Sequence, residues 1–275
     1  MTRLTVACIQ MRGGRQIADN LTNTETLISE AYVGGARVVV TPEMTNLVDL
    51  GAKGPDRPVP EGQDPTLVRL ASLAREKAIT LIIGSLAIAL PEDGRKANRS
   101  YLITPDGAIA ARYDKIHMFD VEIGDGQTYR ESRSYRPGDA AVIGEAPAAR
   151  IGLTICYDLR FPALYQSLAR AGAQIITIPA AFTRLTGEAH WHVLLRARAI
   201  ETGCFILAPA QGGTHEDGRE TFGHSLIVSP WGEIIAEKAD TDPGVLIAEI
   251  DLDDVAKARQ RVPSLEGTRS FHEPR

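Results

Sequence analysis

GARVVVTP at residues 35–42 is nearly repeated as GAQIITIP at residues 172–179. Each copy has a glycine typical of a helix end, then an apolar run, then a proline that cannot continue a central strand. We therefore predict the same unit twice: the end of a helix, a short buried strand and a stop.

A second pair of segments repeats in the same order along the chain. SYLITPDGAI at residues 100–109 matches SLIVSPWGEI at residues 225–234, and each predicts two strands joined by a Pro-x-Gly turn. Because the order is the same, we infer an α/β fold of two similar halves, with their sheets face to face and helices outside. Local coincidence is the alternative interpretation.

The segments around the first repeat alternate between helical and strand-like patterns. A strand is expected at residues 4–9, helices at 20–33 and 66–77, and a buried strand at 80–85. The tail from about residue 252 has no core pattern of its own, and we expect it to be disordered or to lie on a partner subunit.

Length and composition limit the class of protein. The 275 residues are 44% hydrophobic, which suits one large domain at residues 1–275. The net charge of -5 argues against nucleic acid or an anionic membrane as a partner, because neither would meet a broad basic surface. No signal peptide or apolar segment of transmembrane length is visible.

The three cysteines also indicate a cellular compartment. They lack metal-type spacing, and an odd number does not suit a disulfide framework, so we expect a reducing cytoplasm. The glycosylation sequon at Asn98 is then interpreted as a chance match.

ICYDLRFP at residues 155–162 is the segment best suited to covalent chemistry. It predicts a strand that ends at Cys156, a turn, and a helix that begins near Pro162. At such an elbow, helix N-terminal amides favour a thiolate and can bind a developing oxyanion. A strand-end cysteine taken alone is more often a small buried residue, which is our interpretation of Cys8 and Cys204.

Two charged residues follow the other predicted strands. Glu43 comes directly after the first repeat, at the end where α/β sheets hold ligands, and is a candidate general base. Lys115 follows the first predicted hairpin and could polarise a carbonyl oxygen as a fixed cation. A solvated carboxylate and a surface cation are the alternative interpretations.

Several other chemistries are not supported by the sequence. Phosphate-loop, dinucleotide-binding and serine-hydrolase signatures are missing. His190 and His192 would point in different directions on a helix, and no residue is spaced to complete a zinc site, so we expect no metal. A pair of Cys156 with His117, His190 or His224 stays open.

PEM at residues 42–44, DKIHMFD at 114–120 and ICYDLRFP at 155–162 together resemble the nitrilase, or carbon-nitrogen hydrolase, superfamily. Further matching segments extend the resemblance over nearly the whole chain: TGEAHW at 186–191, LRARAIE at 195–201 and GHSLIVSPWG at 223–232. The resemblance implies a four-layer αββα sandwich, a homodimer or higher homo-oligomer, and no metal or organic cofactor.

The resemblance also implies roles for site residues. Glu43 would be the general base, Lys115 the oxyanion stabiliser, Glu131 a second glutamate and Cys156 the nucleophile, with the Tyr157 amide completing the oxyanion hole. Glu43 would take the thiol proton, Cys156 would attack the amide carbon, ammonia would leave, and a Glu43-activated water would hydrolyse the thioester.

The second glutamate has two candidates, because Glu122 also follows Lys115 closely. Glu122 precedes the turn at residues 124–126, and we expect it to face solvent. The spacing of Glu131 from Lys115 resembles the Nit branch of the superfamily, so we prefer Glu131.

The residues after the nucleophile indicate the kind of hydrolase. Cys156-Tyr157-Asp158 differs from the Cys-Trp-Glu of true nitrilases and favours an amidase of the Nit branch, which contains deaminated glutathione amidase and omega-amidase. LRARAIE favours the former. The implied substrate is a small linear amide with a remote carboxylate, and Arg160 or Arg184 is the candidate to bind that carboxylate.

Other functions stay open. They are omega-amidase activity on 2-oxoglutaramate, hydrolysis of an N-carbamoyl amide, and a catalytically silent oligomeric scaffold. Glu188, where the branch usually has proline, and the divergent loop at residues 212–220 leave the substrate undecided.

Overall fold

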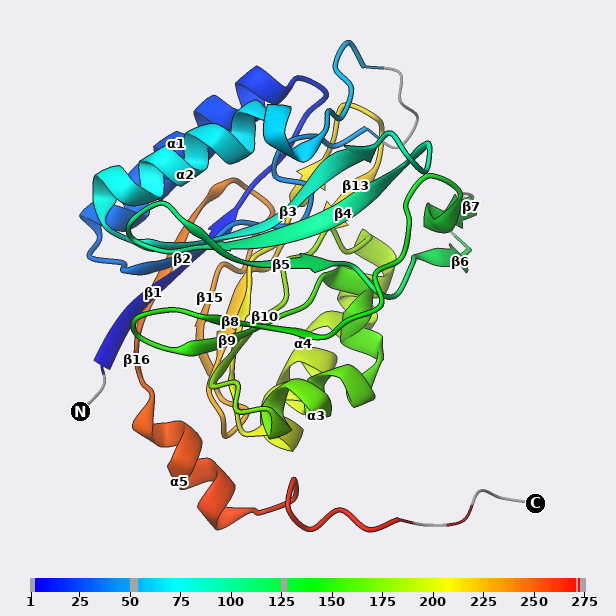
Figure 1. Cartoon of the computed structure of the whole chain (residues 1–275). Helices are drawn as coiled ribbons and strands as arrows, with labels where there is room; N and C mark the ends of the chain where they lie inside the picture. The colour runs from blue at the N-terminus through cyan, green and yellow to red at the C-terminus, as the bar shows by residue number, and fades with distance from the viewer. Residues whose placement is uncertain (1–2, 50–53, 125–127, 271, 273–275) are drawn as a thin grey trace.

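Two six-stranded sheets form the centre of the molecule (Figure 1). The computed structural model describes residues 3–49, 54–124, 128–270 and 272. The first sheet consists, in spatial order, of β16 (Gly244–Asp251), β1 (Arg3–Gln10), β2 (Val38–Val40), β3 (Thr80–Leu90), β4 (Arg95–Ile103) and β5 (Ile109–Asp114). The second sheet consists of β8 (Val142–Glu145), β9 (Arg150–Leu153), β10 (Ile175–Thr177), β11 (Phe205–Ala208), β14 (Leu226–Val228) and β15 (Ile234–Glu237).

The two sheets have the same pairing pattern. From β16 to β5, and again from β8 to β15, the successive pairs are antiparallel, parallel, parallel, antiparallel and antiparallel. The first sequence repeat forms β2 and β10, and the second forms the hairpins β4–β5 and β14–β15, at equivalent places in the two sheets. The prediction of two similar halves is confirmed.

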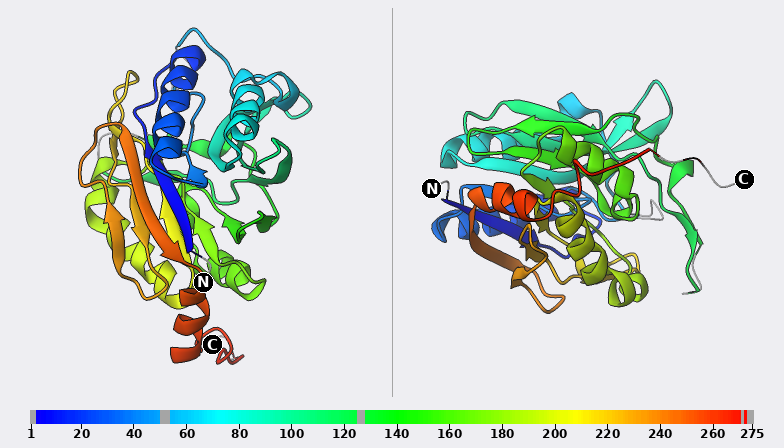
Figure 2. Two further views of the ribbon diagram at one scale, coloured as in Figure 1. Left: turned by 90° about the vertical axis from the view of Figure 1, so that its left-hand side faces the viewer. Right: turned by 90° about the horizontal axis from the view of Figure 1, so that it is seen from below.

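Helices cover the outer face of each sheet (Figures 1 and 2). They are α1 (Ile17–Val33) and α2 (Pro65–Lys77) on the first sheet, and α3 (Pro162–Arg170) and α4 (Arg184–Thr202) on the second. The layers therefore follow the order αββα, as the family resemblance implied. Within the described residues, no helix has the length and apolar character needed to cross a membrane.

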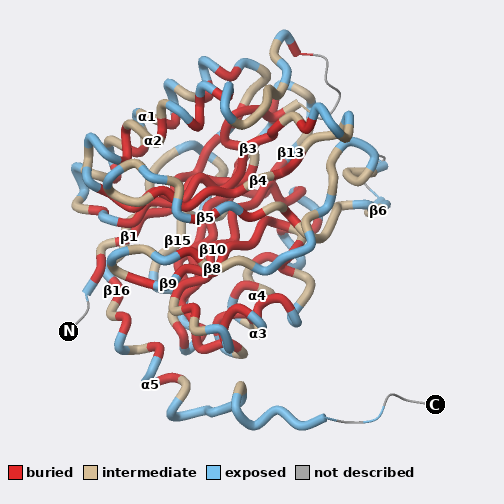
Figure 3. The backbone as a smooth tube through the Cα atoms, in the orientation of Figure 1, coloured by how far each residue is buried: buried red, intermediate tan, exposed pale blue. Residues whose placement is uncertain are grey.

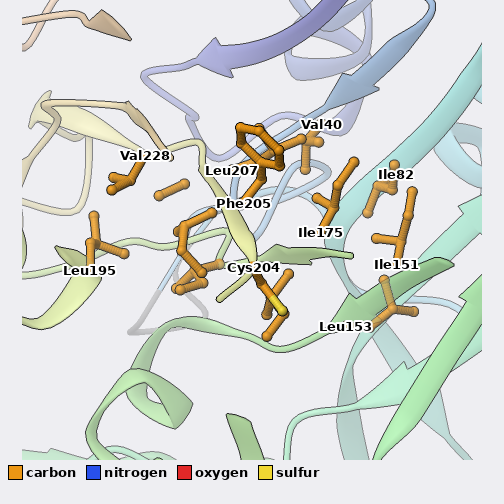
Figure 4. Packing of buried hydrophobic residues seen from close by; sticks show 14 of the residues in the cluster. Val40, Ile82, Ile151, Leu153, Ile175, Leu195, Cys204, Phe205, Leu207 and Val228 are labelled. Atoms are coloured by element: carbon orange, nitrogen blue, oxygen red, sulfur yellow. The ribbon is translucent and has the colours of Figure 1, made fainter. Parts of the chain in front are cut away.

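Both faces of the first sheet are buried, because successive side chains along each strand point to opposite faces. Val6 and Cys8 of β1 belong to the cluster between the sheets, whereas Ala7 and Ile9 pack with the residues of α1 and α2. This follows from the two-residue side-chain period of a strand. Figure 3 shows the buried strands at the centre, and Figure 4 shows side chains from both sheets in the inter-sheet cluster.

Two smaller strand pairs lie outside the main sheets. They are β6 (Asp120–Glu122) with β7 (Thr128–Arg130), and β12 (Gly212–Thr214) with β13 (Glu220–Phe222). The first pair leads into the loop that carries Glu131, and the second includes the divergent loop at residues 212–220. The turn expected at residues 124–126 lies partly outside the described residues.

Two expectations about element boundaries are wrong. β9 ends at Leu153, so Cys156 lies past the strand and begins a short 3₁₀ helix, Cys156–Arg160. The chain after residue 251 forms α5 (Asp253–Arg261), whose Val255 and Ala258 are buried, and Val255 belongs to the larger of the two hydrophobic clusters, which also includes residues of α3 and α4. α5 follows β16 at the end of the molecule where β1 starts (Figure 2). That part of the tail has a core pattern after all, and a subunit contact of the remainder stays a prediction.

Gly84 allows the ends of both repeats to approach β3. A Cβ atom at Gly84 would collide with the carbonyl oxygens of Thr41 and Pro42 and with the Pro179 side chain. The Gly84 amide also donates a 3.0 Å hydrogen bond to Thr41 Oγ1. Because Gly84 has no side chain, the segment that leads into Glu43 can pack directly against the β3 backbone.

We predict that Gly84→Ala lowers the free energy of unfolding by about 1–3 kcal/mol, because the backbone atoms it meets cannot rotate away. Urea denaturation of the purified variant measures the effect. Gly62→Ala is the matched control, since a Cβ there meets no atom within 4 Å. An equal loss in both variants would contradict a steric cause at Gly84.

Candidate active site

Four residues singled out by the sequence line one cavity of about 390 Å³. Glu43 follows β2, Lys115 follows β5, Cys156 follows β9, and Glu131 begins a short 3₁₀ helix directly after β7. Aromatic side chains, including those of Phe119, Tyr157 and Phe182, form much of the remaining wall. Residues distant in sequence thus converge in a recess with both polar and apolar surfaces.

Lys115 is the centre of a buried charge cluster. Its side chain is 2% exposed, and its ammonium donates hydrogen bonds to Glu43 Oε1 at 3.0 Å and to Glu131 Oε2 at 2.8 Å. Burial alone would lower the pKa of Lys115, but the charges of Glu131 and Glu43 outweigh it and raise the pKa well above the ordinary value. The lysine is therefore a permanent cation in the cavity.

Glu43 is held by donors from both halves of the molecule. Besides Lys115, Asn98 Nδ2 donates to its Oε1 at 2.9 Å, and the Ala181 amide donates to its Oε2 at 2.9 Å. Burial favours the neutral acid, but Lys115 and these hydrogen bonds prevail and lower the pKa of Glu43. The carboxylate is therefore ionised and available to accept a proton.

Glu131 contacts Lys115, whereas Glu122 does not. Glu131 also accepts a 2.7 Å hydrogen bond from the Phe119 amide, which fixes the carboxylate beside the lysine. The Glu122 side chain is 67% exposed and pairs with Arg130. The geometry agrees with the preference for Glu131, and its catalytic role stays a prediction.

Asn98 is a site residue that sequence reasoning missed. Its Nδ2 donates to Glu43 at 2.9 Å and to Glu131 at 3.2 Å, so it bridges the two carboxylates. It is fully buried, which is incompatible with glycosylation in the folded chain and agrees with a chance sequon. No sequence signal indicated it, because Asn98 precedes the strand predicted from residue 100, whereas the observed β4 already begins at Arg95.

Cys156 has a strained backbone and a neutral thiol. Its φ of 49° lies in the left-handed region, which costs a non-glycine residue about 1–3 kcal/mol. Burial and the neighbouring Glu43 carboxylate raise the pKa of the thiol well above its ordinary value, against the opposing charge of Lys115. The amides that were expected to favour a thiolate therefore do not outweigh burial and the Glu43 charge, and the thiol keeps its proton until a base takes it.

The Tyr157 amide is available for a ligand. Among the described residues, it donates no hydrogen bond to a side chain or to a backbone carbonyl outside its own short helix. It directly follows Cys156, whose own amide already donates to the Pro179 carbonyl at 2.9 Å. An oxygen atom bound near Cys156 could therefore receive this donor.

The histidines considered as partners of Cys156 have other contacts. His117 Nδ1 lies 2.7 Å from Asp158 Oδ1, His190 Nδ1 lies 3.3 Å from the Arg160 guanidinium, and His224 Nδ1 lies 2.6 Å from the Phe222 carbonyl. None of these three lines the cavity. The carboxylate Glu43 is the better candidate base. Within the described residues, no group of three or more histidine, cysteine or acidic side chains could hold a metal ion.

The two candidate carboxylate-binding arginines lie outside the lining of the cavity. Arg160 covers the rings of Tyr157 and Phe182, which do line it. Arg184 is 60% exposed and pairs with Glu188 and Glu220. Arg160 is thus next to the cavity wall, whereas Arg184 belongs to a surface ion-pair network.

Comparisons with known proteins identify the family. The carbon-nitrogen hydrolase model matches residues 5–260, so the chain belongs to the carbon-nitrogen hydrolase family. The predicted class, an amidase of the nitrilase superfamily and its Nit branch, is also confirmed.

Similar proteins match along almost the whole chain. The deaminated glutathione amidase of Yersinia enterocolitica is 40% identical over 271 residues, covering 98% of this chain and 94% of that protein. The omega-amidase NIT2 of Homo sapiens is 35% identical over 272 residues, covering 98% and 96%. The crystal structure of the C. elegans NitFhit protein superposes with a TM-score of 0.88 at 33% identity, over 97% of this chain and 65% of that longer one.

We predict that Glu131→Gln lowers kcat by roughly 100- to 1,000-fold, because it removes one of the two charges that hold Lys115. Glu122→Gln is the matched control and should change kcat little, since its partner is the surface residue Arg130. Ammonia release by the two purified variants gives the comparison, with thermal unfolding to check the fold. The reverse ranking would assign the second glutamate to Glu122.

Proposed function

We propose that the protein hydrolyses a small linear amide that carries a carboxylate remote from the scissile bond, with release of ammonia. The observation that carries this proposal is the buried cluster in which Lys115 joins Glu43 and Glu131 beside a protonated thiol. Such a cluster supplies a nucleophile, a base and a fixed cation without any added group.

The resting charges support a defined order of steps. Glu43 takes the proton of Cys156 as the sulfur attacks the amide carbon, and the negative charge moves to the amide oxygen. Lys115 and the Tyr157 amide stabilise that oxyanion. The Glu43 acid then protonates the nitrogen of the tetrahedral intermediate. The carbon-nitrogen bond breaks, ammonia leaves, and a thioester remains on Cys156.

Hydrolysis of the thioester completes the cycle with the same residues. Glu43 is again ionised and removes a proton from a water molecule as the water attacks the thioester carbon. Collapse of this second tetrahedral intermediate expels the sulfur, which regains its proton, and the acid product leaves. Glu131 keeps Lys115 charged and in place through both steps.

Deaminated glutathione amidase activity is the variant of this reaction that we favour, because the relative with that name is 40% identical. In that substrate the scissile amide joins a 2-oxo diacid to a dipeptide, so the amine of the dipeptide leaves in place of ammonia and the remaining steps are unchanged. The second candidate is omega-amidase activity on 2-oxoglutaramate, supported by the relative at 35% identity. Hydrolysis of an N-carbamoyl amide is less well supported. Arg160, beside the cavity wall, remains a candidate contact for the substrate carboxylate.

The assembly is proposed to be a cytoplasmic homodimer or higher homo-oligomer. Exposed apolar side chains along α4, namely Leu185, Val193 and Ile200, support a subunit contact on that helix, and Trp231 is 49% exposed. Because Glu43 and Cys156 come from different halves, we also propose that residues 1–275 act as one catalytic domain.

We predict that Cys156→Ala lowers ammonia release at least about a thousandfold, because no thioester can form. Cys8→Ala and Cys204→Ala are matched controls, since both thiols are buried in the core and neither lines the cavity. The assay uses a panel of monoamides of dicarboxylic acids, with thermal unfolding to verify the fold.

Near-normal turnover by Cys156→Ala, or inactivity of a control variant that remains folded, would contradict the assignment of the nucleophile. Absence of hydrolysis of every amide by the wild-type protein, deaminated glutathione included, would favour the catalytically silent scaffold.

A further inference from the structure

The cavity is lined by more positively charged side chains than the proposed mechanism uses. Its lining includes the following charged side chains: Lys96, Lys115, Arg130, Arg133, Arg219, Glu43, Asp49 and Glu131. Lys115 is paired with both glutamates, and Arg130 is paired with Glu122. Arg133 is exposed. Lys96 and Arg219 remain as recessed cations whose role the proposed mechanism does not explain.

Lys96 lies at the start of β4 against the ring of Tyr135. Its ammonium is 4.5 Å from the ring centroid, and backbone hydrogen bonds join residue 96 to residues 134 and 136 on either side of that tyrosine. Within the described part of the chain, no carboxylate lies at ion-pair distance from this ammonium. Burial lowers the pKa of Lys96, and the more distant Asp49 offsets this only in part.

Arg219 approaches the same tyrosine from the loop of the β12–β13 hairpin. Arg219 and Tyr135 line the same cavity, and the positive charge of Arg219 opposes the rise that burial causes in the pKa of the Tyr135 hydroxyl. The Arg219 side chain is 12% exposed, and its Nε is buried without a hydrogen-bond partner in the described structure. Its nearest carboxylate oxygen, Asp217 Oδ2, is 3.6 Å away, beyond a good hydrogen bond.

The buried side chain of His215 anchors the hairpin that carries Arg219. His215 is 4% exposed, and its two ring nitrogens lie 2.8 Å from the Gly13 carbonyl and 2.7 Å from Thr221 Oγ1. The guanidinium is therefore held near the cavity by a packed anchor. A buried donor without a partner costs stability, and a bound anion would recover that cost.

We propose that Lys96 and Arg219 form the subsite that binds the remote carboxylate of the amide substrate, next to Tyr135. The inference rests on the proposed amidase function and assigns the residues that select amides with a carboxylate remote from the scissile bond. The planar guanidinium matches a carboxylate, and the ammonium supplies a second charge. Because Arg219 belongs to the divergent loop at residues 212–220, that loop is assigned a role in substrate selection.

The experiment compares acids with uncharged analogues of the same length. The monoamides of succinic, glutaric and adipic acid are assayed beside their methyl esters by ammonia release. The wild-type protein should prefer an acid over its ester. Lys96→Met and Arg219→Met should each lower kcat/KM for that acid by roughly 10- to 100-fold, mainly through KM, and leave the ester unchanged.

Three further variants test whether the preference for the acid depends on these two cations in particular. Lys96→Arg should keep the preference, because the charge remains. Arg184→Met is the matched control, since it removes an ion-paired arginine that contacts Glu220 of β13 but does not line the cavity. Arg160→Met tests the other candidate cation.

Several outcomes would overturn the inference. They are equal turnover of acid and ester by the wild-type protein, an equal loss of preference in Arg184→Met, and a loss in Arg160→Met with none in Lys96→Met and Arg219→Met. Each leaves the amidase proposal standing. Failure to hydrolyse any amide, deaminated glutathione included, would instead contradict the proposed function, and this inference with it.

Discussion

The buried ammonium of Lys115 is the interaction on which the rest of the site depends. A charge removed from water is tolerated only with close partners, and removing one member of a buried ion pair typically costs about 3–5 kcal/mol. Glu43 and Glu131 are these partners, because each accepts a hydrogen bond from the Lys115 ammonium. Their positions, and that of the bridging Asn98, are therefore set by the same cation that keeps Glu43 ionised beside a protonated thiol.

The duplicated topology brings these groups together without repeating them. When the two repeats are aligned, the position after the proline is Glu43 in the first half and Ala180 in the second. The next residue, Ala181, donates its amide to Glu43. The second copy thus contributes a backbone donor where the first contributes a carboxylate, so the two halves have complementary roles at one site.

Much of the fold was predictable because it follows from local patterns. Two repeats in the same order indicated the similar topology of both sheets, and strand ends located Glu43 and Lys115. Asn98 was not predictable in this way, since its place in the site depends on contacts with Glu43 and Glu131, which lie far from it along the chain. The end of β9 was misplaced for a similar reason: the Ile155 amide bonds to Asp158, whose carboxylate is held by Tyr113 and His117.

The division of the site between the halves makes its chemistry a property of their packing. Cys156 meets Glu43, its proposed base, only when the segment after β2 reaches the segment after β9. Before the sheets pack, the proposed nucleophile lies in one half of the chain and the proposed base in the other. In the proposed mechanism, a newly made or partly opened chain therefore cannot hydrolyse an amide, even where each sheet keeps its own hydrogen bonds.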